Sequence, residues 1–168
     1  MAEETKRLIR EIDLNSRVVV EERYLLNRRI HRNPIEGPAI VRRDPSTGAI
    51  TFEGYYIRGR AHRAEGPAEI SYDVVTGKVT REWWALNGKR HRSDGPSCIL
   101  RDPKTDVVFV EHYCRHGLAH RDPSDGPAIL QRHQKTGKVT RRAYRVHGLP
   151  VKPRRSKPRH VRRGTEPR

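Results

Sequence analysis

The segment HRAEGPAEISYDVVTGKVTREWWALNGKR, residues 62–90, decides the fold because its pattern occurs four times in the chain. A His-Arg dipeptide opens each copy, and an acidic residue followed by Gly-Pro comes shortly after it. Counted from that glycine, a threonine stands ten residues later, an aromatic residue eighteen later and a second glycine twenty-two later. Constant offsets of this kind define an internal repeat. The repeats are predicted at about residues 28–58, 59–87, 88–116 and 117–147.

Each repeat predicts a β-hairpin. Residues 68–72 alternate apolar and polar side chains, which is typical of a half-buried strand. Residues 44–48, DPSTG, have the chemistry of a type I turn closed by a residue in the left-handed region. Residues 78–86 are rich in β-branched and aromatic side chains, which favour a returning strand. Four hairpins and a strand around residues 17–27 predict an all-β antiparallel meander of about nine strands, a single-layer twisted sheet.

The two ends of the chain differ from the repeat domain, which is predicted at residues 17–151. In residues 1–16, Leu8, Ile9 and Ile12 follow helical spacing, so a short N-terminal helix is expected to cap the first strand. Residues 152–168 carry eight basic residues and one acidic residue, with several prolines and few apolar side chains. Such a composition cannot offset the entropy of ordering, so a disordered basic tail is expected.

Composition narrows the classes of partner. The 168 residues have a formal charge of +16, and 33% of them are apolar, which leaves material for a thin core only. A strongly basic chain favours a polyanionic or acidic partner. The two cysteines are too few for a secreted disulfide framework, and no apolar run spans a bilayer. We therefore expect a soluble cytoplasmic protein. Association with a nucleoid or a nucleoprotein assembly is compatible with this location.

The motif G-x-x-H-R-x-[DE]-G-P-A, followed by a turn, an aromatic residue and Asn-Gly, resembles the MORN-variant repeats of bacterial and phage proteins. The resemblance covers about residues 18–150, and the motif recurs in register. It implies an elongated single-layer β-sheet that serves as an interaction scaffold. Some relatives resemble immunity or antitoxin proteins, and MORN repeats have been linked to membranes and to protein partners. This chain departs from the usual pattern in its excess of arginine and its basic tail.

The repeated His-Arg pairs have two interpretations. They could form a row of cationic loops along one edge of the sheet, suited to a phosphate backbone. Alternatively, each Arg pairs with the acid that follows it, as Arg63 with Glu65, while the His stacks on an aromatic residue or bonds a loop carbonyl. Recurrence at identical offsets favours the structural interpretation. The residues concerned are His31, Arg32, His62, Arg63, His91, Arg92, His120 and Arg121.

Further arginines occupy positions where the other repeats hold different residues, so the fold does not require them. These are better candidates for contact with a polyanion. They are Arg28, Arg29, Arg42, Arg43, Arg58, Arg60, Arg101, Arg132, Arg141, Arg142 and Arg145. The tail adds a typical polyanion-binding run, namely Arg154, Arg155, Lys157, Arg159, Arg162 and Arg163.

Catalytic, cofactor and metal sites are not predicted. The chain has no Gly-rich phosphate loop, no nucleophile elbow and no His-Glu-x-x-His helix. A nuclease that uses His and Arg is disfavoured, because catalytic residues do not normally recur four times. His112, Cys114 and His116 share strand parity, but neighbours of one parity lie about 6.8 Å apart along a strand, too far for adjacent zinc ligands.

The sequence favours a non-enzymatic repeat scaffold that binds DNA or RNA sequence-tolerantly through a basic sheet face and the C-terminal arm. The alternative is an immunity-type or inhibitor module, bacterial or phage, that docks on an acidic or nucleic-acid-binding protein. Membrane attachment comes third, because the tail lacks interleaved apolar anchors. The two open edges of a meander leave the oligomeric state undecided.

Overall fold

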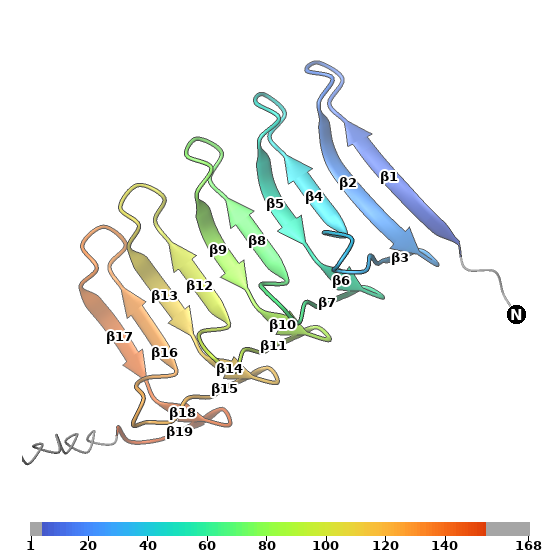
Figure 1. The fold of residues 1–168 in the computed structure, drawn as a ribbon. Coiled ribbons are helices and arrows are strands. Elements are labelled where there is room, and N and C mark those ends of the chain that lie inside the picture. The colour runs from blue at the N-terminus through green and yellow to red at the C-terminus, as the bar shows by residue number, and fades with distance from the viewer. Residues whose placement is uncertain (1–4, 154–168) are drawn as a thin grey trace, which may run out of the picture.

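The computed structural model describes residues 5–153 as an antiparallel β-sheet protein, with no helix in that part of the chain. Ten strands follow one another in chain order across the main sheet, which confirms the predicted meander (Figure 1). They are β1 (Lys6–Ile12), β2 (Val19–Leu26), β4 (Ile40–Arg43), β5 (Ile50–Gly54), β8 (Glu69–Tyr72), β9 (Val79–Trp83), β12 (Cys98–Arg101), β13 (Val108–His112), β16 (Ile129–Arg132) and β17 (Val139–Ala143). The prediction of about nine strands is one short, because residues 6–12 also form a strand.

A second set of very short strands lies along one long edge of this sheet (Figure 1). Each long hairpin is followed by a small hairpin of two two-residue strands, and β3 (Arg29–Ile30) makes the corresponding pair with the end of β2. The other pairs are β6 (Tyr56–Ile57) with β7 (Arg60–Ala61), β10 (Ala85–Leu86) with β11 (Lys89–Arg90), β14 (Cys114–Arg115) with β15 (Leu118–Ala119), and β18 (Arg145–Val146) with β19 (Leu149–Pro150). The repeat therefore contains two hairpins rather than one.

The predicted N-terminal helix is wrong, because Lys6–Ile12 forms strand β1. This strand pairs antiparallel with β2 from Lys6 opposite Leu26 to Ile12 opposite Val19. The eight-residue β2 offers a complete row of backbone donors and acceptors, and pairing with it outweighs a weak helical pattern. Residues 154–168, which hold nearly all of the predicted tail, lie outside the described residues, as do residues 1–4.

The core is thin and repeats with the chain. The residue after each Gly-Pro is fully buried, and Tyr55 and Ala85 are buried beside this row. Four positions with no exposed surface form the row: Ala39, Ala68, Ser97 and Ala128. Small side chains at these positions let successive hairpins approach closely, so a single layer with little apolar material remains packed.

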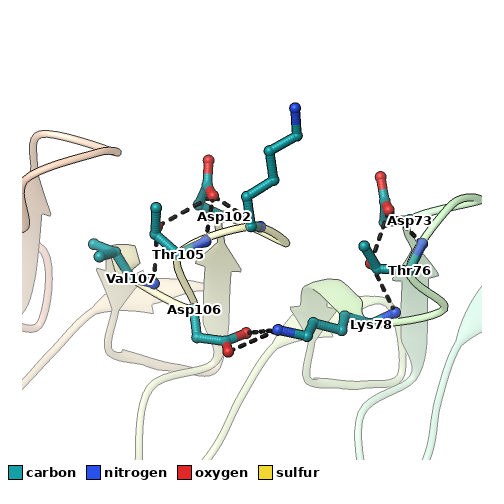
Figure 2. Close-up of polar contacts among 8 residues, drawn as sticks. Asp73, Thr76, Lys78, Asp102, Thr105, Asp106 and Val107 are labelled. Carbon is teal, nitrogen blue, oxygen red and sulfur yellow. Dashed lines mark hydrogen bonds and ion pairs between the residues drawn. The ribbon is translucent and has the colours of Figure 1, made fainter.

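The turns of the long hairpins form the opposite long edge of the sheet. In Figure 2, the Asp73 carboxylate accepts hydrogen bonds from the backbone N–H and the hydroxyl of Thr76, each at 2.8 Å. These bonds hold the pKa of Asp73 below its ordinary value. In the next turn, Asp106 occupies a position with φ of 58° where other repeats have glycine, and its carboxylate lies 2.7 Å from Lys78 Nζ. A positive φ favours glycine, and the ion pair with Lys78 gives Asp106 a contact that glycine could not make.

Candidate nucleic-acid interface

The short hairpins close through two-residue turns in which both residues have positive φ. At Asn87-Gly88 the two φ angles are 51° and 80°, as a type I′ turn requires. The same geometry occurs at Asn27-Arg28, Arg58-Gly59, His116-Gly117 and His147-Gly148. The second glycine of the sequence repeat therefore marks the tip of a second hairpin, which the sequence pattern alone did not reveal.

The histidine of each His-Arg pair follows one short hairpin and fastens the next short hairpin along the chain. His91 Nδ1 accepts a hydrogen bond from the backbone N–H of His116 at 3.2 Å, and the two imidazole rings lie 4.4 Å apart. Equivalent bonds join Arg58 N to His31, Asn87 N to His62 and His147 N to His120, at 3.1–3.2 Å. The histidines thus bind a turn N–H of the next short hairpin rather than a loop carbonyl.

Val151 stands at the histidine position of the last described short hairpin. It donates its N–H to the Tyr144 carbonyl, as His120 does to the carbonyl of Tyr113.

The bond from the turn N–H sets the tautomer of His91 and His120, in which both ring nitrogens are already engaged. When Nδ1 of a neutral imidazole accepts a hydrogen bond, the ring proton sits on Nε2, so neither nitrogen has a free lone pair. Burial is the main cause that lowers the pKa of His91, and the nearby His116 lowers it further. Burial and the nearby His147 lower the pKa of His120 in the same way. No group of three or more potential metal-ligating side chains occurs within residues 5–153.

These histidines predict an acid-sensitive fold. Because their folded-state pKa values lie below the ordinary 6.5, the unfolded chain takes up protons first as the pH falls. Stability should be constant in this respect above about pH 7 and should fall as the pH drops through about 6.5. His112 adds to the effect, since burial and Arg90 lower its pKa as well. Urea unfolding between pH 8 and pH 5.5 measures this, with a His91→Gln, His120→Gln variant expected to show a shallower profile. A flat profile for the unmodified protein would contradict the assignment.

The arginine of each His-Arg pair is a packing residue. The Arg63 guanidinium lies 3.9 Å from the centre of the Tyr55 ring and donates to the Pro67 carbonyl at 3.4 Å. Arg32, Arg92 and Arg121 lie over Tyr24, Trp84 and Tyr113 in the same way, at 3.8–4.0 Å. The predicted pairing with the following acid occurs between Arg92 and Asp94, at 2.9 Å, but among the described contacts Arg63 has no such pair with Glu65. The contacts common to all four arginines are the cation–π contact and a hydrogen bond to a proline carbonyl.

The strand arginines predicted to contact a polyanion do not form one basic face. Arg42 lies 2.6 Å from Glu21, and Arg43 lies 3.2 Å from Glu22. Glu21 and Glu22 are consecutive in β2, so the two pairs lie on opposite faces of the sheet. Arg141 and Arg142 are likewise consecutive in the edge strand β17, where both are exposed. These arginines are therefore distributed over both faces of the sheet, and glutamates neutralise some of them.

The exposed cations gather instead on the edge formed by the short hairpins. The segments 27–30, 56–61, 85–90, 114–119 and 145–150 contain basic residues and no acidic residue. Six basic side chains at the turns are exposed, and we call this set the basic edge: Arg28, Arg29, Arg58, Arg60, Lys89 and Arg115. Figure 1 shows the five short hairpins in one row along the sheet.

Two members of the basic edge are oriented by the glycine of the next turn. A Cβ placed on Gly88 would lie 3.6 Å from Arg60 Cβ, and one on Gly117 would lie 3.8 Å from Lys89 Cβ. The aliphatic stems of Arg60 and Lys89 thus lie against neighbouring turns while their cationic ends remain exposed. This packing lowers the entropy that each side chain loses on binding an anion.

The opposite edge has no such excess of positive charge. Its turns, residues 13–18, 44–49, 73–78, 102–107 and 133–138, contain five aspartates and five Lys or Arg residues. These aspartates include the turn caps, whose pKa values are lowered by hydrogen bonds, so they are ionised at neutral pH. Of the two long edges, the basic edge is therefore the one that carries a net positive charge.

Sequence reasoning identified part of this set. Arg58 and Arg60 were predicted for polyanion contact, and Arg28 and Arg29 were named among the dispensable arginines. Lys89 and Arg115 were missed, although both lie within two residues of a repeated glycine. The repeated glycine was the available signal. A turn at each such glycine would have placed the basic residues beside it in one row. The predicted tail residues, Arg154, Arg155, Lys157, Arg159, Arg162 and Arg163, lie outside the described residues.

The fold and this edge define the class of protein, an antiparallel β-hairpin repeat protein with two hairpins in each repeat. No protein-family model, curated protein or solved structure matches the chain. Within residues 5–153, no helix is long and apolar enough to cross a membrane.

Proposed function

We propose that the protein is a non-enzymatic scaffold that binds nucleic acid through the basic edge, without reading the base sequence. The observation that carries this proposal is the row of short hairpins, which holds six exposed basic side chains and no acid. Five of the six are arginines, whose planar guanidinium groups match phosphate oxygens in bidentate geometry. The resemblance to MORN-variant repeats is part of the same proposal. In it the repeats supply the scaffold, and the additional basic residues select the partner.

The spacing of the basic edge suits a long polyanion. Adjacent short hairpins are separated by two strands of the main sheet, which corresponds to about 10 Å. The turns from Arg28 to Arg115 therefore span about 30 Å. A small anion would occupy one turn only, whereas a nucleic acid backbone can contact several turns at once. Simultaneous contacts convert weak single sites into useful affinity.

Binding should depend steeply on salt, because each phosphate contact releases a condensed counterion. Six contacts predict a slope of log Kobs against log salt of about −5, and contacts from further basic residues would steepen it. We expect dissociation constants of about 1–100 μM near physiological salt, measured by fluorescence anisotropy with labelled oligonucleotides. Failure to bind at low salt would overturn the proposal. Recovery of a stoichiometric protein partner that resists high salt would favour the alternative, an immunity-type or inhibitor module.

A further inference from the structure

Most aromatic side chains of the described residues are covered by the protein itself and offer little surface for stacking. Tyr55 is buried and the others are half-buried, and the rings of Tyr24, Tyr55, Trp84 and Tyr113 each lie beneath an arginine. The rings of Phe52 and Trp83 are covered in the same way by arginines of the sheet. Proteins that bind single-stranded nucleic acids typically combine a basic groove with aromatic rings on which unpaired bases stack. The basic edge offers the charge without the rings.

The basic edge is also held rigidly. Every turn after the first donates N–H groups to the preceding short hairpin or to the histidine that follows it, for instance Gly88 to the Ala61 carbonyl at 2.8 Å and Asn87 to His62 at 3.1 Å. The turns that carry the basic side chains therefore keep fixed separations along the row. A duplex is stiff over this length and presents its phosphates at fixed positions, whereas a single strand must be ordered on binding.

From these two observations, and resting on the proposed function above, we infer that the preferred partner is double-stranded nucleic acid, contacted along its phosphate backbone. The span of about 30 Å corresponds to about nine base pairs at 3.4 Å per pair. The contact is electrostatic and leaves the bases paired and stacked. Its chemistry is common to DNA and RNA duplexes.

The test compares labelled duplexes of about 12 base pairs, as DNA and as RNA, with single strands of the same length, including one of thymidine only. Anisotropy titrations use the full chain at one fixed ionic strength. We expect at least one duplex to bind about tenfold more tightly than either single strand. The two duplex arms then show whether B-form or A-form spacing fits better.

The outcomes separate the inference from the proposed function. Single strands that bind as tightly as both duplexes would overturn the duplex preference and leave nucleic-acid binding in place. No binding by any oligonucleotide would overturn the proposed function itself. As a second measurement, the variant Arg58→Asn, Arg60→Gln, Lys89→Gln should lose the difference between duplex and single strand. A preference that survives in this variant would assign the duplex contact to residues outside the basic edge and overturn the inference.

Discussion

The triple variant Arg58→Asn, Arg60→Gln, Lys89→Gln is expected to bind a nucleic acid duplex on the order of 100-fold more weakly at about 0.1 M salt. Each lost contact to phosphate is worth roughly 1 kcal/mol, and the salt slope should become shallower by about 3. Asparagine is the residue that the next repeat uses at the position of Arg58, with φ of 51° at Asn87 against 49° at Arg58. The variant should therefore fold normally, which unfolding in urea can verify.

A matched control removes the same number of charges from the opposite edge. The variant Arg17→Gly, Lys104→Gln, Lys135→Gln lowers the formal charge from +16 to +13, as the basic-edge variant does. Arg17 has φ of 63°, which glycine adopts freely. If net charge alone governed binding, both variants would weaken it equally. We expect the control to bind within about threefold of the unmodified protein, since distant exposed charges are screened.

The replacement Gly66→Ala is expected to destabilise the fold by about 2–4 kcal/mol. Gly66 has φ of 129°, a conformation that residues with a side chain rarely adopt. Its new Cβ would also stand 3.1 Å from the Arg63 guanidinium carbon, which is fixed between the Tyr55 ring and the Pro67 carbonyl. Backbone strain and overpacking act together here. The free energy of unfolding in urea measures the loss.

Gly48→Ala provides the comparison for this prediction. Gly48 has φ of 71°, and a Cβ placed there meets no atom within 4 Å. Only the backbone term applies, so a cost of about 1–2 kcal/mol is expected. Equal losses in the two variants would show that the contact between Arg63 and Gly66 contributes nothing to stability.

The repeat pattern predicted the long hairpins and their order because both depend on local chemistry. Alternating side chains, turn residues with left-handed conformations and constant offsets are all present within about thirty residues of chain. The short hairpins escaped prediction because two-residue strands are too brief to show alternation. Strand β1 was mistaken for a helix because its conformation depends on pairing with β2, a partner that helical spacing does not reveal.

The candidate site was predicted only in part, for a related reason. Uneven placement of arginine across the repeats indicated which cations the fold could spare, and Arg58 and Arg60 do lie on the basic edge. Whether a charge is free or paired depends on its neighbour in the next strand, which the sequence does not name. Arg42 and Arg43 were therefore grouped together, although they lie on opposite faces beside Glu21 and Glu22.

The sequence by itself determined that this protein is a basic β-hairpin repeat, because repeat register, turn chemistry and net charge are properties of the chain. Only the tertiary structure decided where that charge acts. Stacking of repeats gives each histidine a turn N–H to bind, such as that of His116 for His91, and each repeated arginine an aromatic ring. The recurring His and Arg side chains are therefore used in contacts within the fold itself. The same stacking aligns the exposed cations into one edge, because residues one repeat apart become neighbours in space.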